Sequence, residues 1–142
     1  MKLKVLFGIF LMISLIACSS TTQTIVSDEV IFYGEGDYWK VKYIYNPTLY
    51  DEKGVNWVEI ESKDIEISQE NVNNINIELE SRDGLVKGNV GNMETKISDN
   101  VLSFLVGTVN SETYEEDEYN IMVTFKDKQD VIKLQMNRLW VD

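Results

Sequence analysis

One thiol and a surplus of carboxyl groups are the residues of this chain that could carry out chemistry. Its 142 residues include 24 Asp and Glu, a single Cys and no His. The absence of His excludes Ser-His and Cys-His nucleophile pairs, His-ligated zinc and the commonest general base. Three kinds of chemistry remain: acid–base catalysis by two carboxyl groups, binding of a hard cation by carboxylate oxygens, and modification of the thiol of Cys18.

The composition predicts one small folded domain that does not bind nucleic acid. Hydrophobic residues make up 44% of the sequence, which is enough apolar material to bury a core. The formal net charge at pH 7 is −11. Because binding to phosphates needs clustered Lys and Arg, this acidic balance argues against a nucleic-acid partner.

The first residues have the composition of a secretion signal. Lys2 and Lys4 precede an apolar run at 5–17, VLFGIFLMISLIA. This run is shorter than the roughly 20 residues that a membrane-spanning helix needs. A short apolar run behind basic residues is typical of a cleaved signal peptide, which we expect at residues 1–17.

The signal ends in Leu15-Ile16-Ala17-Cys18, which resembles the lipobox of bacterial lipoproteins and contains the single Cys. The resemblance implies cleavage between Ala17 and Cys18 and a thioether-linked diacylglycerol on Cys18. The alternative is a buried Cys that acts as a small hydrophobic residue. It is disfavoured because the polar residues 19–22 that follow cannot form a core. Two acyl chains would hold the protein durably on the outer side of the bacterial cell membrane.

The chain after the signal divides into a tether and a domain. We expect residues 18–29 to be the lipidated Cys and a polar tether with coil-like reach. Residues 30–142 are expected to form an all-β domain without helices. Acidic residues throughout this domain would keep it away from anionic lipid headgroups.

Alternation of apolar and polar residues predicts about eight or nine short strands separated by turns. This pattern favours an antiparallel β-sandwich of the immunoglobulin-like type, with a barrel as the second choice. A hairpin of 75–81 with 85–90 is expected to close through a type I′ turn at Asp83-Gly84, and 101–109 is expected in the middle of a sheet. The candidate runs, of which 101–109 is apolar on both faces, are 30–33, 38–45, 55–61, 64–68, 74–80, 85–90, 93–97, 101–109, 119–125 and 131–136.

Three short motifs carry competing interpretations. Trp39 is expected in the core, whereas Trp57 shares a face with Glu59 and Trp140 lies near the end of the chain, so both could be exposed and stack against sugars. The acidic run at 115–118 lacks the spacing and the Gly of a calcium loop, which favours a solvated loop. The glycines at 34–36 lack the Lys and the helix of a phosphate-binding loop, which favours a turn or bulge.

Two segments of the domain carry a wider resemblance. The sequences GEGDYWKV at 34–41 and IMVTFKDKQDVIKL at 121–134 resemble the start and the closing hairpin of small uncharacterised lipoproteins of Gram-positive Firmicutes. The chain departs from them at Gly36, where Ser is usual, and at Phe125, where Trp is common. The resemblance implies an extracytoplasmic β domain and supplies no activity, so no catalytic residue is carried over.

The sequence leaves three functions open. The first is a non-enzymatic, monomeric binding module without cofactor or metal, anchored to the membrane through Cys18, whose partner is an envelope protein or a wall component. The alternative is a module that binds carbohydrate or cell-wall glycan through exposed Trp side chains. The third is a hydrolase that uses two carboxyl groups, which requires two acids within about 5–10 Å of each other in a cleft.

Overall fold

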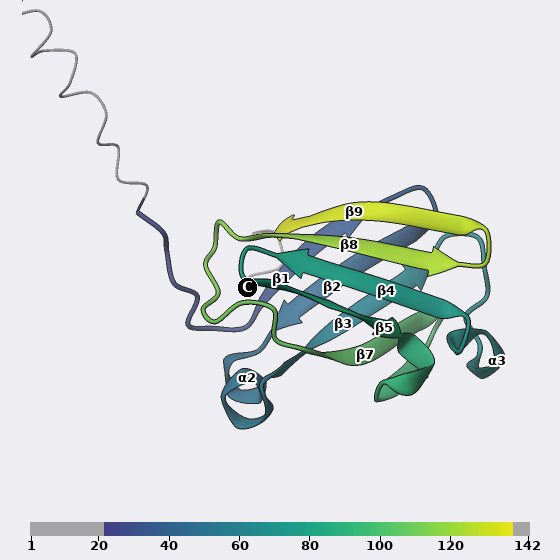
Figure 1. The fold of residues 1–142 in the computed structure, drawn as a ribbon, viewed down its shortest axis with the longest axis horizontal. Helices are drawn as coiled ribbons and strands as arrows, with labels where there is room; N and C mark the ends of the chain where they lie inside the picture. Colours follow the sequence, from purple (N-terminus) through teal and green to yellow (C-terminus); the bar gives the residue numbers. More distant parts are fainter. Residues whose placement is uncertain (1–21, 138–142) are drawn as a thin grey trace, which may run out of the picture.

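Nine antiparallel strands form one continuous sheet in the computed structural model, which describes residues 22–137. The sheet order is β5-β4-β8-β9-β1-β2-β3-β7-β6 (Figure 1). The signal peptide at 1–17, Ala17, Cys18 and Trp140 lie outside the described residues. The strands are β1 (Val30–Glu35), β2 (Trp39–Tyr45), β3 (Val55–Ser62), β4 (Ile75–Ser81), β5 (Gly84–Asn89), β6 (Thr95–Ser98), β7 (Val101–Gly107), β8 (Glu118–Phe125) and β9 (Lys128–Met136).

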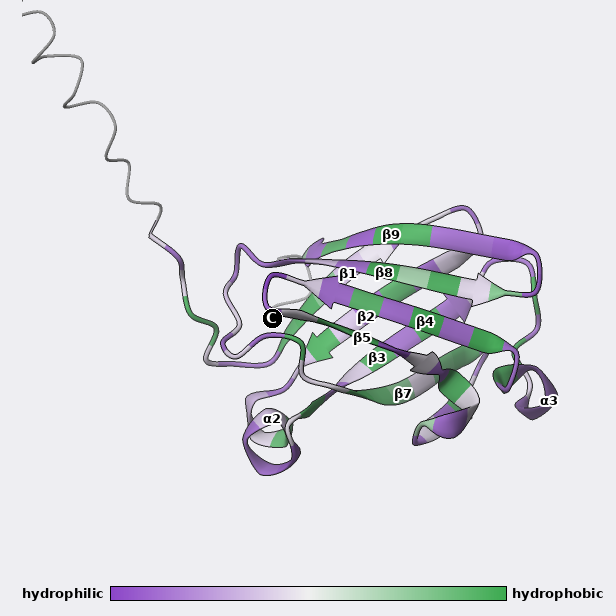
Figure 2. Ribbon diagram, in the orientation of Figure 1, coloured by the Kyte–Doolittle hydropathy of each residue, from purple (hydrophilic) through white to green (hydrophobic). Residues whose placement is uncertain are grey.

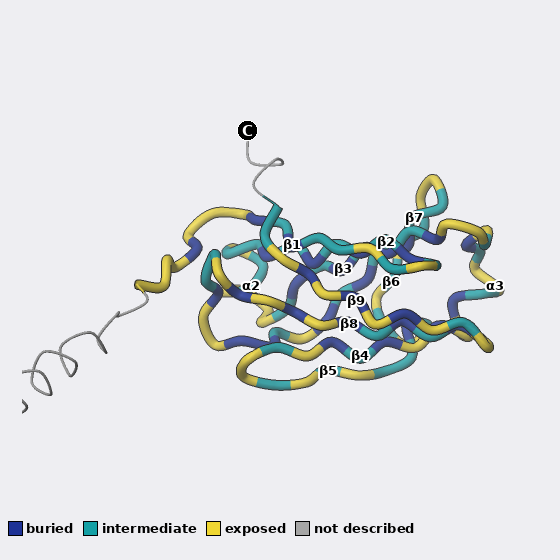
Figure 3. Tube along the Cα trace, turned by 90° about the horizontal axis from the view of Figure 1, so that it is seen from above, coloured by how far each residue is buried: buried dark blue, intermediate teal, exposed yellow. Residues whose placement is uncertain are grey.

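The sheet curls into a half-barrel, with β1, β2, β3 and β7 on one side and β4, β5 and β8 on the other (Figure 3). The all-β class, the antiparallel pairing and the strand number are confirmed. The prediction of a sandwich of two separate sheets, and of an immunoglobulin-like arrangement, is not confirmed. The reason is that β9 pairs with β1, Phe32 opposite Met136, and thereby joins the two sides. Alternating burial looks the same in a sandwich and in a curled sheet, so the pattern cannot distinguish them.

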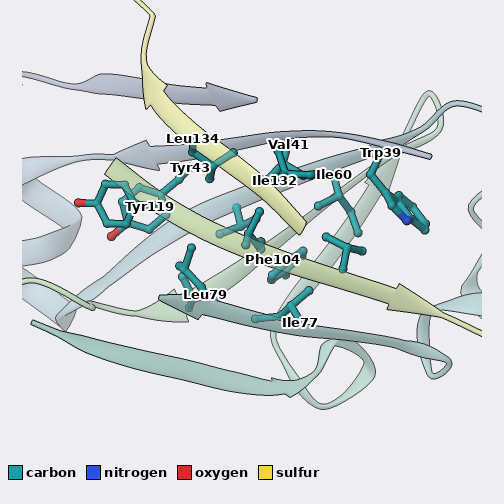
Figure 4. Close-up of a cluster of buried hydrophobic side chains, with 14 of the residues drawn as sticks. Trp39, Val41, Tyr43, Ile60, Ile77, Leu79, Phe104, Tyr119, Ile132 and Leu134 are labelled. Atoms are coloured by element: carbon teal, nitrogen blue, oxygen red, sulfur yellow. The ribbon is translucent and has the colours of Figure 1, made fainter. Parts of the chain in front are cut away.

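The concave face of the half-barrel is filled by the inward side chains of every second residue. Apolar and polar positions alternate along the strands (Figure 2), and side chains from both sides of the curl meet inside (Figure 4). Trp39 is 1% exposed, which confirms its predicted place in the core. The Tyr119 ring lies 4.9 Å from Phe32 and 4.4 Å from Tyr43, measured between centroids. Burial of such side chains is the main stabilising contribution to the fold.

Within residues 22–137, three short helices correct the prediction of a domain without helices. They are α2 (Pro47–Lys53), α3 (Gln69–Val72) and the 3₁₀ turn η1 (Val90–Asn92). The Asn46 side chain caps α2 by accepting a hydrogen bond from the Leu49 N–H at 2.9 Å, and Pro47 occupies its first turn. Gly54 ends the helix in the left-handed conformation, with φ 63°. Asn before Pro is therefore a helix start here, because Pro needs no N–H in the first turn.

Two predicted strands differ from the structure. Residues 64–68 form a loop rather than a strand, because Asn100 accepts a hydrogen bond from the Ile67 N–H at 2.7 Å and takes the place of a neighbouring strand. The run at 101–109 gives β7, which lies next to the edge strand β6, whereas β1 is the middle strand. Its outward face is apolar at Leu105 because this residue lies beside Trp57 on β3.

The predicted hairpin between β4 and β5 is confirmed, but its turn is not of type I′. Ser81 pairs with Gly84, so Arg82 and Asp83 are the turn residues, and neither has a positive φ. The geometry with two positive φ angles occurs instead at Asp99 and Asn100, between β6 and β7, where φ is 50° and 65°. Asn and Asp tolerate this conformation better than other residues with side chains.

One buried carboxylate holds the turn between β1 and β2. Asp130 on β9, 6% exposed, accepts hydrogen bonds from the backbone N–H groups of residues 37, 38 and 39 at 3.2, 2.8 and 3.0 Å. A Cβ on Gly36 would lie 2.5 Å from the Asp130 Oδ2 atom, so only Gly allows this approach. The predicted turn in the 34–36 segment therefore begins at Gly36, after β1 ends.

Replacing this carboxylate tests how much the turn depends on it. We expect Asp130→Ala to lower the free energy of unfolding by roughly 2–4 kcal/mol, because three N–H groups, of which that of Trp39 is buried, lose a charged acceptor. Urea denaturation measures the change. Asp127→Ala, an exposed change in the β8–β9 turn, is the matched control and should stay within about 0.5 kcal/mol of the unaltered chain. Equal stability of the two variants would contradict this role.

Candidate functional site

The outward face of β1, β2, β3 and β7 brings an aromatic side chain and ordered charges together. We call it the Trp57 face. Its residues stand in cross-strand rows because paired residues of neighbouring strands point to the same side of a sheet. The Trp57 face consists of Ile31, Tyr33, Lys40, Lys42, Ile44, Trp57, Glu59, Glu61 and Leu105.

An apolar row forms one margin of the Trp57 face. Ile31 pairs with Ile44, Ile44 with Trp57, and Trp57 with Leu105. All four are half-buried, although they lie on the convex side of the sheet. The indole of Trp57 therefore lies between aliphatic neighbours and keeps part of its surface open to a ligand.

Two rows of ion pairs lie beside the apolar row. The Lys42 Nζ is 3.6 Å from a Glu59 carboxylate oxygen, and the Lys40 Nζ is 3.0 Å from Glu61. The hydrogen bond from Lys40 to Glu61 raises the pKa of the Lys40 ammonium. These groups and Tyr33 line a hollow of about 40 Å³. Paired charges beside a Trp ring supply hydrogen-bond donors and acceptors in fixed positions next to a stacking surface.

A second polar cluster closes the end of the half-barrel at the β7–β8 loop, residues 108–117. Asp117 is 7% exposed and accepts hydrogen bonds from Arg82 at 2.5 Å, from the Asn110 amide at 3.1 Å and from the Tyr114 N–H at 2.9 Å. Asn110 also accepts from the Asp83 N–H at 3.3 Å. This cluster joins the β4–β5 turn to the β7–β8 loop, and its polar atoms form hydrogen bonds with one another.

Carboxyl groups meet in an open hollow of about 430 Å³ beside this cluster, lined in part by Glu80, Asp117 and Glu118. Asp117 already forms an ion pair with Arg82. Hydrogen bonds from Lys133 and Gln135 lower the pKa of Glu118. A general acid for glycoside hydrolysis needs a raised pKa, so Glu118 does not support the hydrolase hypothesis.

The acidic run at 115–118 does not converge on a metal. Asp117 points inward, whereas Glu118 is exposed on β8 and pairs with Lys133. Within residues 22–137, no group of three or more Cys, Asp or Glu side chains is placed to hold a metal ion. The run is thus partly a buried structural element, which differs from the solvated loop that the sequence predicts.

Two buried tyrosines have hydrogen-bonded hydroxyl groups in the interior, which sequence reasoning missed. The Asn56 amide donates to the Tyr43 hydroxyl at 3.0 Å, and the Asn110 amide donates to the Tyr119 hydroxyl at 3.3 Å. Burial raises the pKa of Tyr43, and it raises the pKa of Tyr119 to about 12. The only signal in the sequence was a pair of inward-facing Tyr residues, since a partner Asn cannot be recognised without the fold.

Of the two Trp residues predicted to stack against sugars, Trp57 is described and faces outward. Its expected place beside Glu59 is confirmed, while Cys18, Ala17 and Trp140 lie outside the described residues.

No family model, no curated protein and no solved structure matches the chain. Among residues 22–137 there is no helix with the length and apolar character needed to cross a membrane.

The buried tyrosines predict a loss of stability at alkaline pH. An unfolded Tyr ionises near pH 10, whereas Tyr119 in the folded chain ionises at about 12. The unfolded state therefore holds fewer protons between these values, and stability that is complete below pH 10 falls as pH rises toward 12. Urea midpoints across this range measure the decline. Tyr119→Phe should make the decline shallower. A pH profile identical to that of the unaltered chain would count against the assignment.

Proposed function

We propose that this chain is a lipid-anchored extracytoplasmic lipoprotein of the bacterial cell envelope whose domain works by binding. The observation that carries the proposal is the sequence Leu15-Ile16-Ala17-Cys18 at the end of a basic and apolar leader. Its Cys is the only one in the chain. Lipid attachment to Cys18 would place the acidic domain outside the cytoplasm, with two acyl chains as a durable anchor.

The fold supports this role in two ways. The described domain needs no thiol, because its core consists of apolar and aromatic side chains from the strands. Its buried acids, Asp117 and Asp130, serve as acceptors within the fold. The charged groups of the Trp57 face form cross-strand pairs, Lys40 with Glu61 and Lys42 with Glu59, which suits recognition of a wall component or an envelope protein rather than of nucleic acid.

Removal of the thiol tests the anchor. In a bacterial host that processes lipoproteins, the unaltered chain should fractionate with membranes, and Cys18→Ser should remain uncleaved or be released, because no thioether can form. Ser19→Ala is the matched control and should keep both the modification and the membrane location. Mass spectrometry of the N-terminal peptide, together with fractionation, decides the outcome. An unmodified Cys18 thiol on a correctly exported chain would refute the proposal.

A second candidate function is binding of a cell-wall glycan on the Trp57 face. The observation that favours it is the half-buried Trp57 ring beside the Lys42–Glu59 pair. A pyranose ring has an apolar face that stacks on an indole and hydroxyl groups that bind carboxylates and ammonium groups. Stacking and hydrogen bonding would thus come from adjacent rows of the same face.

Co-sedimentation with insoluble cell-wall material tests this function. Trp57→Ala should reduce the bound fraction about tenfold or more, because a stacking contact contributes up to about 1.5 kcal/mol and its loss also uncovers the neighbouring polar groups. Met122→Ala on the outward face of β8 is the control, since it removes a half-buried side chain elsewhere on the sheet. Equal binding by the unaltered chain and Trp57→Ala would exclude the Trp57 face as the glycan site.

A further inference from the structure

Residues 24–26, which we call the strap, are attached to the domain rather than free. The Val26 N–H donates to the Thr113 carbonyl at 2.9 Å, and the Glu115 N–H donates to the Thr24 carbonyl at 2.9 Å. The Thr24 N–H also donates to a Glu116 carboxylate oxygen at 3.0 Å. The two backbone bonds form an antiparallel bridge between Ile25 and Tyr114.

The strap buries one of its two apolar side chains in the domain. Val26 is 7% exposed and belongs to the hydrophobic core, whereas Ile25 is 62% exposed. A segment that is a free coil would bury neither its apolar side chain nor its backbone hydrogen bonds. The last part of the segment expected to be a tether, 18–29, thus belongs to the folded domain.

The loop beneath the strap is held firmly from its other side. Arg82 on the β4–β5 turn pairs with Asp117, and its guanidinium lies 4.8 Å from the centre of the Tyr114 ring. It also donates to the Glu112 carbonyl at 2.8 Å. The strap is therefore bonded to a well-supported surface, so a pull on the N-terminal chain would act on this end of the domain.

The strap enters at one end of the half-barrel. In Figures 1 and 3 the N-terminal chain meets the domain on the side of α2, and α3 lies at the opposite end. The anchored chain would accordingly approach the domain from the end that carries α2 and the β7–β8 loop.

Attachment of the strap halves the possible reach of an anchored domain. Cys18 lies six residues before Thr24, the first residue bonded to the loop, and six extended residues span at most about 20 Å. With the strap detached, the first residue of a strand would be Val30, twelve residues from Cys18, which permits about 40 Å.

We propose that the strap sets both the height and the orientation of the domain: it keeps the α2 end toward the membrane, within about 20 Å of the bilayer. This inference rests on the lipid anchor of the proposed function. It also leaves the Trp57 face roughly upright and open to a partner in the wall, because that face runs along the strands rather than across their ends.

Hydrogen exchange tests attachment of the strap independently of any lipid. Val26→Pro removes the N–H that bonds to Thr113, whereas Ile25→Pro, the matched control, keeps both bridging bonds because the Ile25 N–H takes part in neither. The Glu115 amide should exchange at least tenfold faster in Val26→Pro than in Ile25→Pro. Unchanged protection of the β1–β2 amides shows that the variant is folded. Equal exchange of Glu115 in both variants would overturn the attachment.

Energy transfer to a membrane tests height and orientation. The lipidated chain from a bacterial host is reconstituted in phosphatidylcholine vesicles that contain an acceptor-labelled lipid. A donor dye is placed on a new thiol at Glu52→Cys in α2 or Glu70→Cys in α3, both exposed. Transfer from the α2 dye should exceed transfer from the α3 dye in the otherwise unaltered chain and in Ile25→Pro. This difference should shrink in Val26→Pro.

The outcomes separate the two proposals. Equal transfer from both positions in the strapped, membrane-bound chain would overturn the inference while leaving the lipid anchor intact. If instead Cys18 itself takes up dye and the chain washes off the vesicles, the proposed function fails and the membrane orientation fails with it. Hydrogen exchange then still decides whether the strap is part of the domain.

Discussion

The pairing of the last strand with the first is the interaction on which the rest of the structure depends. β9 lies beside β1 in the middle of the sheet, and the Asn137 N–H donates to the Ile31 carbonyl at 2.9 Å. The approach is close enough that a Cβ on Gly34 would lie 2.2 Å from the Lys133 carbonyl oxygen. Only Gly permits backbones to come this near. With this contact, nine strands close around one core; without it, the two sides of the half-barrel would be separate sheets.

Buried polar groups define the two ends of that core. At one end, the Asp130 carboxylate accepts hydrogen bonds from N–H groups of the β1–β2 turn. At the other, Asp117 binds Arg82 and Asn110, and the strap rests on the same loop. In an acidic chain such carboxylates are costly to bury unless every acceptor position is used. Because the carboxylates of Asp130 and Asp117 accept hydrogen bonds from these loops, the loops are ordered and cover both open ends of the half-barrel.

The two regions with a proposed function lie on different parts of the domain. The strap and the β7–β8 loop govern how the N-terminal chain reaches the domain, while the Trp57 face lies on the outside of the central strands. The ion pairs of that face are partly exposed and contribute little to stability. They are accordingly able to exchange partners with a ligand, whereas Arg82 is held by the buried carboxylate of Asp117.

The sequence by itself determined the strand content, most inward residues and the one modifiable thiol, because alternation and local motifs are encoded over a few neighbouring residues. The core position of Trp39 followed directly from that alternation. The sequence misplaced the segment at 64–68 and the 101–109 strand, and it missed α2, since Asn46-Pro47 suits a turn as well as a helix start. Only the tertiary structure decided that one sheet forms instead of two, that Leu105 and Ile44 flank Trp57, and that residues 24–26 join the domain. Each depends on pairing between residues far apart in the chain, and the energy of such contacts leaves no trace in local sequence.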